Sequence, residues 1–150
     1  MYLEFSLVKQ FCVIVLLTVG NGIFSMVEMS IVSSHQSRLE SMAEEGNKSA
    51  KIVLKLRENP NKMFSTVQFG MTLVSLLTGV YGGTEMAGPL SQYVKLVPGL
   101  EPYAYTISMV TIVVVITYLT LILGELVPKR IAIDSPEKIA CLLARPMLCF

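Results

Sequence analysis

Three apolar stretches of about 20 residues each set the limits on what this chain can fold into. The stretch Phe11–Val32 contains one charged residue, Glu28, and the stretches Met63–Tyr81 and Tyr103–Leu123 contain none. About 20 residues of α-helix span the ~30 Å hydrocarbon core of a bilayer. Charged residues make up 15% of the chain, whereas soluble domains have about 25%. The sequence therefore predicts an all-α membrane protein with three transmembrane helices.

The distribution of basic residues predicts the orientation of these helices. Six of the twelve basic residues lie between positions 33 and 62, and four more follow Gly124, whereas the segment Gly82–Pro102 contains only Lys95. Basic residues are enriched in cytoplasmic loops. We therefore expect the N-terminus outside, and the first loop and the C-terminal segment in the cytoplasm.

The connecting segments also carry patterns. The apolar residues of Ser37–Glu45 and of Ser49–Glu58 recur at helical spacing, which predicts a cytosolic juxtamembrane helical hairpin that is broken at residues 46–47. Asn59 and Pro60 are expected to begin the second membrane helix. The segment Gly82–Pro102 is rich in glycine and proline, which predicts an outer loop with one short helix near residues 90–96. Residues 139–150 form a truncated fourth apolar segment, membrane-embedded or interfacial.

Each predicted membrane helix has one polar or small face, and we expect the three faces to meet. Residues three or four apart share a helix face. Small and hydroxyl residues also line ordinary contacts between membrane helices, an alternative that explains the carboxylates Glu28 and Glu125 less well. The faces consist of Asn21, Ser25 and Glu28 in the first helix, Ser65, Gln68, Thr72, Ser75 and Gly79 in the second, and Thr117, Thr120 and Gly124 in the third.

Glu125 and Pro128 suggest a cation site at the inner end of these faces. A carboxylate is costly near a bilayer core and usually marks an ion or substrate path. Pro128 has no N–H, so the carbonyl of Gly124 loses its helical partner and becomes a second oxygen donor beside Glu125. Sites made of oxygen donors suit Mg²⁺ and Ca²⁺. No histidine or cysteine joins this set, which disfavours zinc; we expect His35 to be a surface residue.

Several function classes are disfavoured. The net charge of +1 gives no basic surface for nucleic acid. No nucleophile–base pair, zinc motif or phosphate loop is recognisable, so we do not expect an enzyme. The three cysteines lie in apolar segments without metal-ligand spacing and are expected to be buried small hydrophobes.

The motifs resemble those of the cyclin-M (CNNM)/CorC family, whose bacterial branch is called hemolysin-like. Residues 24–28 read F-S-M-V-E, as in the family's F-S-x-x-E, and residues 124–129 read G-E-L-V-P-K, as in its G-E-x-x-P-K. Further matches are S-R-L at 37–39, G-N at 46–47, E-N-P at 58–60 and Q-F-G at 68–70, which includes Gly70. Together the two longer motifs, with Pro128 and Lys129 in the second, are specific to this family.

The resemblance implies a multi-pass protein of the bacterial inner (plasma) membrane, in contact with lipid and assembled as a homodimer. It also implies a site for Mg²⁺, or Co²⁺, made by Ser25, an asparagine of the second helix, the Gly124 carbonyl and Glu125. Full-length relatives continue into cytosolic CBS domains that bind adenine nucleotide. ATP binding is therefore expected only in those domains, which this sequence lacks. Residues 1–150 are thus expected to be a CNNM-type transmembrane domain that is incomplete at its C-terminus.

One position departs from the family pattern. Met71 stands where ion-transporting relatives have asparagine, and a thioether is a poor ligand for a hard cation. Gln68 or Thr72 is a candidate replacement oxygen donor. Glu28 is either a further ligand or the ion-pair partner of Lys129 or Arg130.

Three hypotheses of function follow. The first is transport of a divalent cation, Mg²⁺ or Co²⁺, out of the cytoplasm. The second is export of a polyamine or another organic cation, which does not need the missing asparagine. The third is a membrane anchor for CBS regulatory domains that transports nothing.

Overall fold

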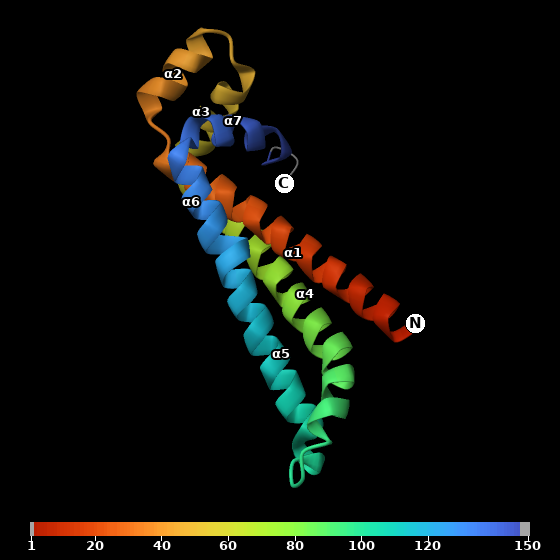
Figure 1. Ribbon diagram of the computed structural model, residues 1–150. Helices are drawn as coiled ribbons and strands as arrows, with labels where there is room; N and C mark the ends of the chain where they lie inside the picture. The colour runs from red at the N-terminus through yellow and green to blue at the C-terminus, as the bar shows by residue number, and fades with distance from the viewer. Residues whose placement is uncertain (1, 148–150) are drawn as a thin grey trace.

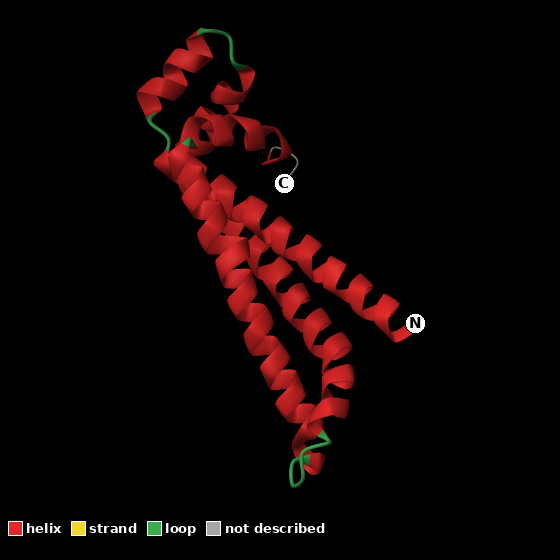
Figure 2. Ribbon diagram, viewed as in Figure 1, coloured by secondary structure: helices red, strands yellow, loops and turns green. Residues whose placement is uncertain are grey.

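The computed structural model describes the backbone of residues 2–147 and the side chains of residues 8–146. In this range every regular element is a helix (Figures 1 and 2). The elements are α1 (Tyr2–Ser33), α2 (Gln36–Glu44), α3 (Lys48–Glu58), α4 (Pro60–Val94), the short 3₁₀ helix η1 (Glu101–Tyr103), α5 (Ala104–Leu121), the π-helical turn η2 (Ile122–Leu126), α6 (Val127–Asp134) and α7 (Pro136–Met147).

Three helical stretches are long and apolar enough to cross a membrane, which confirms the predicted fold class. They are Val8–Ser33, Pro60–Val94 and Glu101–Asp134. The helices α4 and α5 run side by side, and α1 packs against α4 as far as Gln10, which hydrogen-bonds Glu85, while its axis diverges from theirs toward its N-terminus (Figure 1). Large apolar side chains on their outer faces are exposed, among them Leu16, Phe69 and Tyr118. A lipid bilayer is the solvent that suits such faces. Their orientation in the membrane stays a prediction from the basic residues.

The predicted outer loop is wrong for residues 82–89, and the short helix expected near residues 90–96 is the end of the long helix α4. The structure continues α4 through Gly82, Gly83 and Pro89 as far as Val94. Gly82 and Gly83 are buried, and a Cβ atom at Gly82 would lie 2.0 Å from the Cδ1 atom of Ile116 on α5. These glycines therefore permit close approach of two membrane helices, a common use of small residues in bilayers. Pro89 removes one backbone hydrogen bond, and Figure 1 shows α4 curving toward α5 in its last turns.

The helical hairpin is confirmed to within one residue at each end. Gly46 has a φ of 94°, a conformation in which glycine costs least. The Asn47 side chain caps α3 by accepting hydrogen bonds from the N–H groups of Ser49 and Ala50. Pro60 begins α4 as predicted, but the Asn59 side chain makes no capping hydrogen bond. The two hairpin helices bury Leu39, Ala50 and Val53 in one apolar core.

The fourth apolar segment folds as α7 and packs on this hairpin core. Ala140 and Ala144 are buried against it, and α7 contacts α1 and α3. Glu137 is buried on the same side of the helix, whereas Lys138, Leu142 and Arg145 are exposed. Only part of the segment can be described, because residues 148–150, with Cys149, lie outside the described residues. Cys12 is exposed and Cys141 half-buried, so the expectation of buried cysteines is wrong for Cys12.

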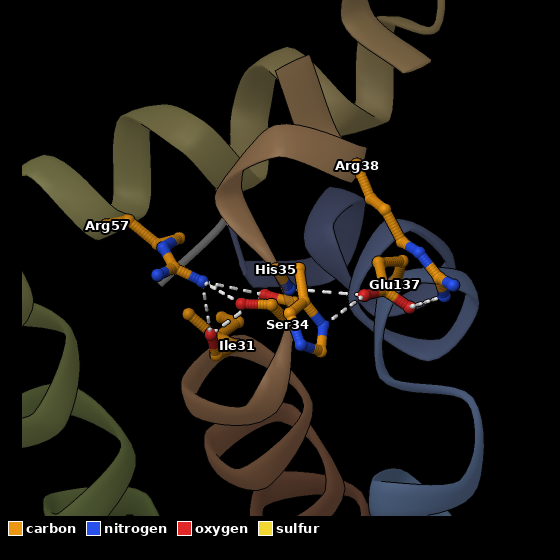
Figure 3. Close-up of polar contacts among 6 residues, drawn as sticks. All are labelled: Ile31, Ser34, His35, Arg38, Arg57 and Glu137. Carbon is orange, nitrogen blue, oxygen red and sulfur yellow. Dashed lines mark hydrogen bonds and ion pairs between the residues drawn. The ribbon is translucent and has the colours of Figure 1, made fainter. Parts of the chain in front are cut away.

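Two polar junctions attach the hairpin and α7 to the end of α1 (Figure 3). At the first, the Arg57 guanidinium of α3 donates from Nη1 to the carbonyls of Ile31 and Ser34 and to the Ser34 hydroxyl. At the second, Glu137 of α7 accepts from the His35 backbone N–H at 3.1 Å, and its carboxylate lies 3.8 Å from Arg38. A cation at a helix C-terminus and a carboxylate in the first turn both complement the helix dipoles.

The Glu137 junction predicts a loss of stability in acid. Burial alone raises the pKa of Glu137, but the hydrogen bonds from His35 and from its own backbone N–H, with the charge of Arg38, outweigh burial and lower the pKa below 4.5. A carboxyl whose pKa is lower in the folded protein stabilises the fold above its unfolded pKa, and that contribution disappears as the pH falls through the folded pKa. We therefore expect the free energy of unfolding to decrease as the pH falls below 4.5, and Glu137→Gln to lessen that decrease.

Thermal unfolding in detergent across the acid range measures this effect. The matched control is Glu40→Gln, because Glu40 is exposed and, among the described residues, its carboxylate accepts a hydrogen bond only from Gln36 of its own helix. An acid profile that Glu137→Gln leaves unchanged would contradict the assignment.

Candidate functional site

The centre of the candidate site is the carbonyl group of Gly124 in the π-helical turn. In η2 the Val127 N–H donates to the carbonyl of Ile122, five residues back, and Pro128 has no N–H to offer Gly124. The Gly124 oxygen accepts instead from the Ser25 hydroxyl at 3.0 Å and from the Asn21 amide at 3.1 Å. The carbonyl that proline frees is therefore used to join α1 to η2.

Small residues bring these backbones together. A Cβ atom on Gly124 would lie 3.2 Å from the Thr18 carbonyl oxygen, and one on Gly22 would lie 3.0 Å from the Pro128 ring. A Cβ atom on Gly70 of α4 would lie still closer, 2.7 Å from the Phe24 ring. The motif residues Gly70 and Pro128 thus serve helix packing around Ser25, which is fully buried.

Two carboxylates share one ammonium group beside this junction. The Nζ atom of Lys129 lies 2.9 Å from Oε1 of Glu125 and 3.6 Å from Oε2 of Glu28. Glu28 lies on α1, Glu125 on η2 and Lys129 on α6. Of the alternatives that the sequence left for Glu28, the structure has the ion pair with Lys129.

These groups line an open cleft of about 660 Å³ between α1, α4 and α5, which we call the polar cleft. One part of its wall is polar and charged, and another is apolar, with Leu76, Val80, Met109 and Val113. Gln68, Thr72, Ser75 and Gly79, four of the five predicted face residues of α4, are among its lining. The full lining is Asn21, Glu28, Gln68, Met71, Thr72, Ser75, Leu76, Gly79, Val80, Met109, Val113, Glu125 and Lys129.

A smaller pocket of about 150 Å³ adjoins the polar cleft and shares Asn21, Ser75, Gly79 and Glu125 with it. Thr117 and Thr120 of α5 also line the small pocket. The Thr120 hydroxyl is buried and has no hydrogen-bond partner in the described part of the protein. Polar faces of all three membrane helices therefore meet here, as the sequence predicted.

The two candidate oxygen donors of the second helix, Gln68 and Thr72, both line the polar cleft, but they differ in their hydrogen bonds. The Thr72 hydroxyl donates to the Gln68 carbonyl of its own helix. Met71 faces Ser25, with its sulfur 3.3 Å from the hydroxyl oxygen. Among the described residues no three histidine, cysteine or acidic side chains gather as for a metal ion. A hard cation here would thus rely on two carboxylates together with hydroxyl, amide and carbonyl oxygens.

Two interactions of the site, one made by Asn21 and one by Lys129, were not predicted from the sequence. Asn21 was placed on the polar face of the first helix, but its hydrogen bond to Gly124 was not foreseen. Lys129 was considered as a partner of Glu28 only, whereas its shorter contact is with Glu125. The spacing of four residues between Glu125 and Lys129 favours an ion pair on any helix, and this signal could have identified it.

Comparison with known proteins places the site in a family context. Residues 11–150 match the family described as the cyclin M transmembrane N-terminal domain. The chain is 49% identical over 134 residues to the UPF0053 protein sll0260 of Synechocystis, covering 89% of this chain and 30% of that protein. It is 33% identical to the UPF0053 protein YhdP of Bacillus subtilis, covering 85% of this chain and 29% of that one. It is also 29% identical to a polyamine export protein of Escherichia coli, covering 94% of this chain and 31% of that protein. The chain thus spans less than a third of the length of these relatives.

Proposed function

Because the chain belongs to the cyclin M transmembrane-domain family, we propose that it carries a cation across a membrane and binds it in the polar cleft. The observation that carries this proposal is the ammonium group of Lys129, held between carboxylates of two different helices. Buried or half-buried carboxylates on membrane helices are costly unless they bind a positive charge. A site that holds one tethered cation has the chemistry to hold a mobile one.

The first cargo that we propose is a divalent metal ion, Mg²⁺ or Co²⁺. Glu28 and Glu125 together supply two negative charges, which match one divalent ion. The Ser25 hydroxyl and the Gly124 carbonyl, 3.0 Å apart, are buried next to the cleft rather than in its lining, and they become neutral oxygen donors when their mutual hydrogen bond opens. Mg²⁺ favours such donors and usually keeps several waters, and the volume of the polar cleft accommodates a hydrated ion. We propose export from the cytoplasm of a bacterium, because the site lies at the end of the bundle that the basic residues place inside.

A polyamine is the second candidate, and a specific feature of the cleft favours it. The apolar wall made by Leu76, Val80, Met109 and Val113 suits the methylene groups of an aliphatic amine, while the carboxylates suit its ammonium groups. Met71 beside Ser25 is a poor metal ligand but an ordinary neighbour for a methylene chain. The resemblance to the polyamine export protein of Escherichia coli agrees with this candidate.

A membrane anchor for CBS domains is the remaining alternative, and the homodimer and the ATP-binding CBS domains stay predictions of the family resemblance. The anchor alternative requires no cation in the polar cleft. The same experiment therefore separates it from both cargo proposals.

The test is thermal unfolding of the purified protein in detergent, titrated separately with Mg²⁺, Co²⁺, Ca²⁺ and spermidine. A ligand at a hundred times its dissociation constant stabilises a fold by about 2.7 kcal/mol. We expect one cation class to do so in the wild type and to lose most of that effect in Glu125→Gln. The matched control is Glu101→Gln, which removes an exposed carboxylate outside the polar cleft.

Each outcome selects a different conclusion. Selective stabilisation by Mg²⁺ or Co²⁺ supports the metal cargo, and stabilisation by spermidine alone supports the polyamine. If no cation stabilises the wild type, or if Glu125→Gln responds as the wild type does, the proposed site is refuted.

A further inference from the structure

The three charged residues among those that line the polar cleft are Glu28, Glu125 and Lys129, with a net charge of −1. The amine of Lys129 therefore already occupies the position between the two carboxylates, 2.9 Å and 3.6 Å from them. A doubly charged cation entering beside it would meet only one uncompensated negative charge and a neighbouring ammonium group. The two charges that such a cargo needs become available only when Lys129 withdraws.

Lys129 has the means to withdraw without any change in the backbone. Its charge sits on a flexible stem with four methylene groups, and its side chain is 29% exposed. Glu28 and Glu125, at 24% and 37% exposure, are accessible from the cleft that the cargo would enter. The ammonium group can thus exchange the carboxylates for solvent at the edge of the cleft.

We propose that Lys129 is a tethered counter-cation that determines which cargo the polar cleft accepts. It holds the two carboxylates while the cleft is empty, and a bound cargo displaces it. A monovalent ion offers no more charge than the amine that it must displace, and the amine has the advantage of being attached. A divalent ion or a polyamine carries more positive charge and therefore displaces the Lys129 amine from the two carboxylates. Lys129 thereby excludes monovalent ions such as K⁺ from a site in which carboxylates alone would bind them. This inference rests on the proposed function.

The alternative role for Lys129 is structural, because its ion pairs also connect α1 to η2 and α6. In that case its replacement would weaken both the fold and any binding. The two roles therefore predict opposite changes in affinity.

The experiment compares wild type, Lys129→Gln and Lys129→Arg in detergent, with ionic strength held constant by N-methyl-D-glucamine chloride so that screening does not vary. Isothermal calorimetry measures the dissociation constants of Mg²⁺ and spermidine, with and without K⁺. A like charge within ~4–6 Å changes the affinity of a site for a positive charge by about tenfold or more. We expect Lys129→Gln to bind the cargo about tenfold more tightly than the wild type and to become sensitive to K⁺. Lys129→Arg keeps the charge and should resemble the wild type.

The experiment gives different results if the counter-cation role of Lys129 is wrong and if the proposed cation transport is wrong. If the wild type binds a cation and Glu125→Gln does not, but Lys129→Gln binds no more tightly and ignores K⁺, the counter-cation is refuted while the proposed function stands. If neither the wild type nor Lys129→Gln binds any cation, both are refuted.

A second measurement covers the case in which Lys129→Gln does not fold. Acylation of lysine amines in the wild-type protein, located by mass spectrometry, measures whether the Lys129 amine is paired with the two carboxylates or free to react. We expect its acylation rate to rise when the cargo is added, and that of the exposed Lys51 and Lys95 to stay constant. An unchanged rate at Lys129, with cargo bound, overturns the inference.

Discussion

Replacing Gly124 with valine is expected to lower the free energy of unfolding by about 4 kcal/mol and to abolish cation binding. A Cβ atom at this position would lie 3.2 Å from both the Thr18 carbonyl oxygen and the Asn21 amide nitrogen. The Thr18 oxygen belongs to the backbone of α1 and cannot move alone, so η2 must separate from α1. That movement also breaks the hydrogen bonds from Ser25 and Asn21 to the Gly124 carbonyl.

Thermal unfolding in detergent, with and without the cation that stabilises the wild type, measures both effects of Gly124→Val. Gly20→Val is the matched control, because Gly20 lies on α1 and a Cβ atom there meets no heavy atom within 4 Å. A Gly124→Val protein that keeps the wild-type unfolding temperature and its response to the cation would show that close packing of η2 on α1 is dispensable.

Arg57→Met is expected to destabilise the protein by about 3 kcal/mol, since hydrogen bonds to charged groups contribute about 1.5–3 kcal/mol each and are not additive. The Arg57 guanidinium satisfies carbonyl groups at the C-terminus of α1, which have no helical partner there. It also places a positive charge at the negative end of the α1 dipole. Methionine preserves most of the length of the side chain, so the decrease in the free energy of unfolding measures the contribution of the polar contacts.

The same unfolding measurement applies, and Lys55→Met is its control. Lys55 is a basic residue of the last turn of α3 like Arg57, but it is exposed. Arg57→Lys should lie between the wild type and Arg57→Met, because an ammonium group keeps the charge but loses the planar donor geometry. Equal stability of Arg57→Met and Lys55→Met would mean that the cap of α1 contributes nothing.

The two junctions of Figure 3 and the polar cleft are both connected to α1. Ser34, which Arg57 contacts, lies six residues after Glu28, a rise of ~9 Å along a helix. The hairpin and α7 are therefore attached to the helix that supplies one of the two carboxylates. Changes at Arg57 are for this reason informative about the cleft as well as about stability.

The sequence by itself determined the helical class, the three spans and the hairpin, because these depend on local pattern. A bilayer requires about 20 apolar residues per helix, and the three stretches have that length. The break at Gly46 and Asn47 follows from local backbone preferences. The freed carbonyl of Gly124 was also foreseen, since Pro128 has no N–H whatever surrounds it.

Only the tertiary structure decided how α4 ends and how the charges of the site are paired. Gly82, Gly83 and Pro89 indicate a loop when only local preference is considered, but contact with α5 favours a continued helix with small residues at the interface. The Gly124 oxygen, free by local rules, is bonded to Ser25 and Asn21 because α1 packs against it. The placement of Lys129 between Glu28 and Glu125 requires three segments to meet, and the distances between separate helices are not encoded in the spacing along any one of them.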